Sequence, residues 1–89
     1  MITKEILYEA NDLVGGDRQK DYGDKVKNHN NIAKLWSAYL DVKIEAHDVA
    51  IMMALLKVAR TKLGAVSKDT YIDMSAYSAI AGEIKWRKK

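Results

Sequence analysis

The apolar residues of this chain recur at helical spacing in four segments and nowhere alternate with the period of a strand. The spacing predicts helices over residues 3–14, 28–40, 45–63 and 69–86. Proline is absent, so nothing in these segments interrupts a helix. We therefore expect an all-α fold, a single compact domain that resembles a four-helix bundle.

The third predicted helix differs from the others in the extent of its apolar surface. Its sequence, EAHDVAIMMALLKVARTKLG, is apolar over most of its circumference. Such a helix is either the central helix of the domain or one that a second subunit covers. We expect the chain to form a homo-oligomer, a dimer or larger.

A polar segment, residues 15–28, separates the first two predicted helices. It reads GGDRQKDYGDKVKN, with three glycines and no apolar stripe, and it is longer than most plain connections. Arg18 and Lys20 suit contacts with phosphate, Tyr22 offers a face for base stacking, and Asn28 suits a base or ribose edge. A solvated loop whose charges pair with one another is the alternative. Asp24 or Asn28 is expected to cap the second helix.

When successive residues are placed 100° apart around each helix, three charged residues fall inside the apolar arcs of the last two helices, and a fourth, Lys57, lies at the edge of an arc. The four are Asp48, Lys57 and Arg60 on the third helix and Asp73 on the fourth. An unpaired buried charge costs several kcal/mol. These groups must therefore pair with one another, as Asp48 or Asp73 with Arg60, meet a ligand or a metal ion, or line a wet cavity.

Glu45 and Asp48 form an E-x-x-D step that puts two carboxylates on adjacent turns of one helix face. This spacing suits Mg²⁺, which needs few carboxylates when substrate phosphate and water supply the remaining ligands. The alternative is a solvated Glu45 that interacts favourably with the helix dipole. His29 and His47 lack a third ligand at helical spacing, so we expect no zinc site.

Composition and charge narrow the class of protein. The 89 residues include no cysteine, which excludes disulfides and thiolate metal sites. The net charge of +3 comes from the end of the chain, where four of the fifteen bases lie in the last five residues. The body is nearly neutral, which argues against a binder of duplex nucleic acid. We expect no membrane span, because no apolar run is long enough, and a soluble cytoplasmic protein.

Three motifs, GDRQKDYGDKVKNHNNIAKLWSAYL, HDVAIMMALLKVAR and DTYIDMSAYSAIAGEI, together resemble a family of small phage and prophage proteins of uncharacterised function. The chain is also similar to the nucleotide-modification-associated domain and, more distantly, to MazG-like nucleotide pyrophosphohydrolases. The resemblance implies a location in the cytoplasm of an infected or lysogenic bacterial host. By position, the family pattern singles out these residues: Arg18, Asp21, Tyr22, Gly23, Asn28, Trp36, Asp48, Lys57, Arg60, Asp69, Asp73 and Tyr77.

Three functional hypotheses follow. The first is a protein that binds a phosphorylated nucleotide or a related metabolite without turnover, with phosphate held by Arg18, Lys20, Lys57 and Arg60 and a base stacked on Tyr22 or Trp36. The second is a Mg²⁺-dependent, MazG-like pyrophosphohydrolase with the ligands Glu45, Asp48, Asp69 and Asp73. The second predicted helix lacks the E-x-x-E step that such enzymes use. The third is a non-catalytic oligomeric interaction protein.

Overall fold

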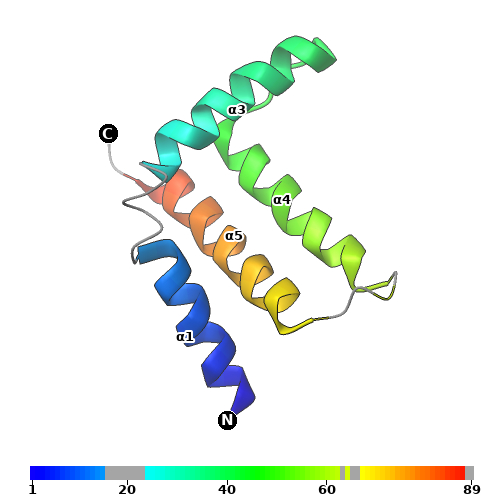
Figure 1. Cartoon of the computed structure of the whole chain (residues 1–89). Helices are drawn as coiled ribbons and strands as arrows, with labels where there is room; N and C mark the ends of the chain where they lie inside the picture. Colours follow the sequence, from blue (N-terminus) through cyan, green and yellow to red (C-terminus); the bar gives the residue numbers. More distant parts are fainter. Residues whose placement is uncertain (16–23, 63, 65–66, 88–89) are drawn as a thin grey trace.

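The computed structural model describes residues 1–15, 24–62, 64 and 67–87. These residues form four helices, which Figure 1 shows as a bundle: α1 (Ile2–Gly15), α3 (Lys25–Leu40), α4 (Ala46–Arg60) and α5 (Lys68–Trp86). No strand occurs in this part of the chain. The predicted all-α fold is confirmed. None of these helices is long and apolar enough to cross a membrane.

The central position in the bundle belongs to α5. It packs against α1 on one side and α4 on the other, while α3 packs on α4 near the start of that helix (Figure 1). A central position in the domain was one of two explanations for the large apolar surface of the third predicted helix. This helix is α4, and it does not lie at the centre of the bundle. The other explanation, a face covered by a second subunit, stays open.

The α3 helix begins earlier than its apolar pattern predicts. Asp24 is its N-cap, with one carboxylate oxygen accepting hydrogen bonds from Val26 N–H at 2.8 Å and Lys27 N–H at 3.4 Å. Residues 25–28 are therefore helical, and Gly15 is the last residue of α1. The polar loop predicted over residues 15–28 is too long at both ends, because a cap and not an apolar stripe sets the start of α3.

The ends of α3 and α4 are fixed by local hydrogen bonds. Asp41 ends α3 in the left-handed conformation, with φ of 55°. The Ser37 hydroxyl then donates to Ile44 C=O at 3.1 Å and accepts from Ile44 N–H at 2.8 Å, which closes the turn into α4. At its other end α4 stops at Arg60, three residues before the predicted boundary, where Thr61 N–H bonds to Val58 C=O in a tighter turn.

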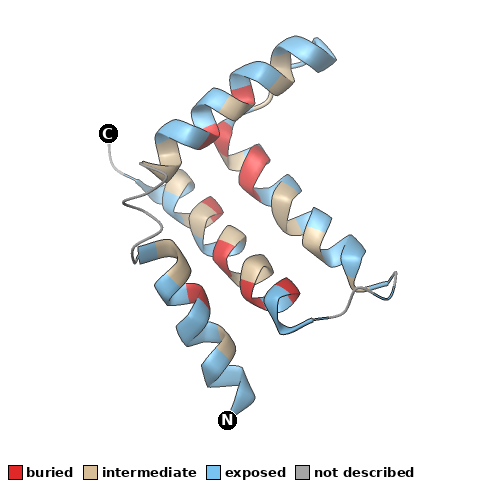
Figure 2. Cartoon of the chain, viewed as in Figure 1, coloured by how far each residue is buried: buried red, intermediate tan, exposed pale blue. Residues whose placement is uncertain are grey.

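The core between the helices is built mainly from alanine. The buried apolar residues are Ala10, Ala33, Ala46, Val49, Ala50, Ile72, Ala76 and Ala81 (Figure 2). Ile6, Leu13 and Val14 of α1 pack against the part of this core formed by Ala10, Ile72 and Ala76. Small side chains let the helices approach closely, but they bury little apolar surface.

Ion pairs join α5 to each of the other helices. Lys68 reaches Glu9 at 3.0 Å and Glu5 at 3.8 Å on α1, and the hydrogen bond to Glu9 raises the pKa of Lys68 above its ordinary value of 10.5. Lys57 of α4 pairs with Asp73 at 3.3 Å. Lys25 of α3 pairs with Glu83 at 3.8 Å and also donates to Val14 C=O at 3.4 Å, so it links three helices.

Candidate functional site

The charges predicted to point inward on α4 and α5 do not form one network in the described part of the chain. Asp48 is exposed, and its carboxylate accepts a hydrogen bond from Glu45 N–H at 2.9 Å, so it caps its own helix. The prediction of an inward Asp48 is wrong. Met52 and Leu55, which share its face, are themselves 40% and 59% exposed, so the apolar arc includes the outer side of α4.

Of the alternatives for these charges, an ion pair does form, but it is not the one named between Arg60 and Asp48 or Asp73. Asp73 pairs with Lys57, whose side chain is only 14% exposed, while Arg60 is exposed at the end of α4. Lys57 precedes Arg60 by almost one helical turn and lies on the side of α4 that faces α5. The pair Lys57–Asp73 therefore accounts for two of the four inward charges as contacts between helices.

The carboxylates named for Mg²⁺ lie at two ends of the bundle. Glu45 and Asp48 are at the start of α4, whereas Asp69 and Asp73 are in the first half of α5, which runs antiparallel to α4 (Figure 1). Within the described ranges no three His, Asp or Glu side chains come together as a set that could hold a metal ion. The proposed metal ligands are thus not gathered, and the E-x-x-D step serves as a cap.

The residues predicted to bind a nucleotide are spread over the chain. Arg18, Lys20, Asp21 and Tyr22 lie outside the described residues. Asn28 and Trp36 are on α3, and Tyr77 is half-buried on α5. Lys57 and Arg60 occupy the end of α4 that lies away from α3 (Figure 1). The described members of this set therefore do not form one site within a single chain.

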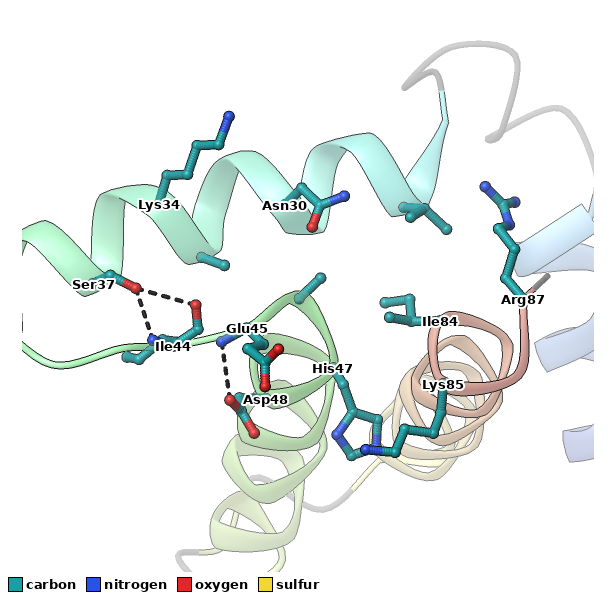
Figure 3. A pocket seen from close by; sticks show the side chains of 13 residues that line it. Asn30, Lys34, Ser37, Ile44, Glu45, His47, Asp48, Ile84, Lys85 and Arg87 are labelled. Atoms are coloured by element: carbon teal, nitrogen blue, oxygen red, sulfur yellow. Dashed lines mark hydrogen bonds between the residues drawn. The ribbon is translucent and has the colours of Figure 1, made fainter. Parts of the chain in front are cut away.

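A different set of residues lines an open cleft between α3, the start of α4 and the end of α5. The cleft has a volume of about 950 Å³, and aliphatic side chains of Val26, Ala33, Ile44 and Ile84 form part of its wall. Figure 3 shows its polar and charged lining: Asn30, Lys34, Ser37, Glu45, His47, Asp48, Lys85 and Arg87.

Three elements present these side chains. Asn30, Lys34 and Ser37 follow one another at i, i+4 and i+7 on α3 and so share a face. Ser37 is tied to Ile44 and so holds the start of α4 at the cleft. His47 of α4 and Lys85 of α5 reach the opposite side (Figure 3).

The cations of the cleft differ in how far they are neutralised. Arg87 forms a fork, with one nitrogen 3.6 Å from Asp24 and the other 2.9 Å from Glu83. The hydrogen bond from Val26 N–H, chiefly, and the nearby Arg87 hold the pKa of Asp24 below its ordinary value of 3.8. Lys34 and Lys85 are exposed, and within the described residues neither has an ion-pair partner. These two ammonium groups are available to an anion.

Sequence reasoning missed most of the cleft. Lys85 and Arg87 entered only as two of the four bases at the end of the chain, and His47 was considered only as a zinc ligand. Lys34 and Ser37 were a usable signal, because they interrupt the largely apolar second half of α3, whereas Asn30 lies in a polar run. That these three elements meet depends on the tertiary packing, which helical periodicity does not reveal.

Comparison with known proteins identifies the family. Residues 5–85 match the family described as "Domain of unknown function (DUF6378)". The chain belongs to this family. It is 42% identical over 76 residues to the Gene 55 protein of Mycobacterium phage L5, which covers 84% of this chain and 49% of that protein. It is 39% identical over 83 residues to the Gene 55 protein of Mycobacterium phage D29, which covers 93% of this chain and 55% of that protein.

These matches confirm the predicted resemblance to a small phage protein family of unknown function. The chain spans about half the length of the curated relatives it matches. No solved structure matches this chain.

Proposed function

We propose that the chain binds a phosphorylated nucleotide, or a metabolite derived from one, in the cleft between α3, α4 and α5, and does not transform it. The observation that supports this proposal most directly is that two lysines without an ion pair among the described residues line one cleft together with aliphatic side chains. A ligand with an anionic end and a flat, weakly polar end satisfies both parts.

The chemistry of the lining fits such a ligand. Lys34 of α3 and Lys85 of α5 both line the cleft, and in Figure 3 the Lys34 ammonium extends away from α4, so its flexible side chain would turn inward to meet a phosphate. The Asn30 amide has a donor and an acceptor, as recognition of a base edge requires. The cleft volume of about 950 Å³ is within the range of pockets that bind small molecules. Arg87 is already paired with Asp24 and Glu83, so the attraction for an anion would come from Lys34 and Lys85.

Residues predicted from the loop would add to this site. Arg18, Lys20 and Tyr22 belong to the segment that enters α3 at Asp24, and the Asp24 carboxylate pairs with Arg87 of the cleft. The contribution of these loop residues stays a prediction from the sequence. It is testable separately, because Arg18→Ala should weaken binding without changing the helical content.

The choice of a nucleotide over other phosphorylated molecules rests on the resemblance to nucleotide-modification-associated and MazG-like proteins. The same resemblance supports a location in the cytoplasm of the phage-infected host. Binding without hydrolysis needs fewer assumptions than turnover, since the carboxylates of the enzyme hypothesis lie at opposite ends of the bundle.

Calorimetric titration with a panel of nucleoside mono-, di- and triphosphates tests the proposal. We expect at least one to bind, and Lys34→Ala and Lys85→Ala each to weaken its binding about tenfold or more, since a hydrogen bond to a charged group contributes roughly 1.5–3 kcal/mol. The matched control is Lys27→Ala, an exposed lysine on α3 that does not line the cleft. Equal losses in all three variants would indicate unspecific attraction and contradict the proposal.

Incubation of the bound nucleotide with Mg²⁺ separates binding from turnover. We expect the nucleotide to be recovered intact. Release of pyrophosphate or a monophosphate that stops in Asp48→Ala would replace the binding function with hydrolysis. Failure of every nucleotide to bind or to shift the melting temperature would remove both.

A further inference from the structure

The outer face of α4 is apolar and uncovered. Ile51, Met52, Leu55 and Val58 are 39%, 40%, 59% and 45% exposed, whereas the buried residues Ala46, Val49 and Ala50 face α3 and α5. Figure 2 shows exposed residues along the second half of this helix. The helix therefore has two apolar faces, of which its own bundle uses one.

Helical geometry defines the centre of this outer face. At 100° per residue, Ile51, Met52, Val58 and Ala59 all fall within about 60° of Leu55. Asp48 falls within about 20° of Leu55 near the start of α4, and Lys62 lies in the turn that follows the end of α4 at Arg60. Each of these residues is exposed. The face is thus an apolar stripe that ends in an acid on one side and in a base on the other.

We propose that this face pairs with the same face of a second copy of the chain, as two antiparallel α4 helices centred on Leu55. A two-fold axis at Leu55 places Met52 of each copy opposite Val58 of the other, and Asp48 near the turn that contains Lys62 of the other copy. An acid then lies near a base at both ends of the contact. A C2 interface requires such self-complementarity, because the same surface is used by both copies. A parallel pairing would place acid against acid and base against base.

The accessible surface of the chain is larger than that of a typical monomer of its mass. The accessible surface is 6772 Å², about 1,500 Å² more than the roughly 5,200 Å² expected for a monomeric protein of 10.0 kDa. The radius of gyration, 13.8 Å, also exceeds the value of about 12 Å expected for this length. A standard interface removes about 800 Å² from each partner, and the excess, a total for the whole chain, does not locate the interface.

Sedimentation velocity over a concentration series tests the pairing. We expect the full chain to form a dimer, and Leu55→Glu to raise its dissociation constant about a hundredfold or more, because two carboxylates would meet at the two-fold axis. The matched control is Leu35→Glu, since Leu35 is 62% exposed but lies on α3. We expect this variant to dimerise like the unmodified chain.

The absence of cysteine allows a test of the register. Leu55→Cys places one thiol per chain at the axis, where packed helices bring Cα atoms close enough for a disulfide. Mild oxidation should link Leu55→Cys chains efficiently and leave Leu35→Cys chains unlinked. Lys62→Glu should weaken the dimer, and the added change Asp48→Lys should restore it.

A chain that stays monomeric at millimolar concentration would overturn the proposal. So would a dimer that Leu35→Glu dissociates and Leu55→Glu leaves intact. Equal disulfide formation by both cysteine variants would show that α4 is not the contact.

Discussion

The Asp24 side chain both caps a helix and forms an ion pair. Its carboxylate caps α3 through Val26 and Lys27 and also pairs with Arg87 at the end of α5. These contacts favour the ionised form and hold the pKa of Asp24 below 3.8. Because the pKa is lowered in the folded state, the stabilisation is complete above the unfolded value of 3.8 and disappears as the pH falls through the folded value.

Asp24→Asn isolates the contribution of the charge. The amide oxygen of asparagine can still cap the helix, but it loses the attraction to Arg87. We expect the unmodified chain to be more stable than the variant at pH 7, and the difference to shrink as the pH falls below about 3.8. Urea unfolding at several pH values measures this difference. Asp12→Asn, an exposed position on α1, is the control, and a difference independent of pH would contradict the assignment.

At the scale of single residues, the sequence showed which charged residues interrupt an apolar pattern, but it did not show which groups those residues contact. Asp48 and Asp73 both interrupt apolar patterns, but Asp48 caps its own helix and Asp73 meets Lys57. The choice between such partners depends on the rotation of α4 about its axis. A helix that is apolar on two sides leaves that rotation undetermined until it packs against α5.

At the scale of helices, the contact between α4 and α5 contains the Lys57–Asp73 pair. The Lys57 side chain is 14% exposed and the Asp73 side chain 32% exposed, with 3.3 Å between nitrogen and oxygen. We expect Asp73→Ala to lower the free energy of unfolding by about 1–3 kcal/mol, because the Lys57 ammonium would remain partly desolvated without its partner. Adding Lys57→Met should recover most of this loss, since no charge then remains at the contact.

Urea unfolding of the two single variants and the double variant measures this coupling. Asp12→Ala on α1 should change stability little, because Asp12 is exposed and has no ion pair in the described part of the chain. Additive losses in the double variant would show that the two side chains do not depend on each other.

The existence and order of the helices could be predicted from the sequence, and their ends only in part. Apolar spacing located all four segments, whereas Asp24 and Thr61 moved the boundaries of α3 and α4 by a few residues. The cleft could not be predicted, because its lysines come from α3 and α5, which are far apart in sequence. Only the packing of both near the start of α4 brings them together.

At the scale of the whole molecule, the proposed cleft and the proposed pairing meet at Asp48. This residue lines the cleft and lies at one end of the outer face of α4. In the antiparallel pair, the turn that contains Lys62 of the second copy would lie near Asp48 and so would border the cleft. The ligand and the second copy would then both lie next to Asp48. Binding of each would therefore change the affinity of the chain for the other.

Self-association also has a consequence for stability. The core of one copy consists mostly of alanine, so a single chain buries little apolar surface. If the folded state is a dimer, its stability rises with protein concentration by mass action. We expect the melting temperature to increase by about 3–5 °C for each tenfold increase in concentration of a domain this small. Calorimetric scans across a hundredfold concentration range measure it. Leu55→Glu should melt lower and independently of concentration, while Leu35→Glu should keep the dependence; a constant melting temperature in the unmodified chain would mean that one copy folds without the other.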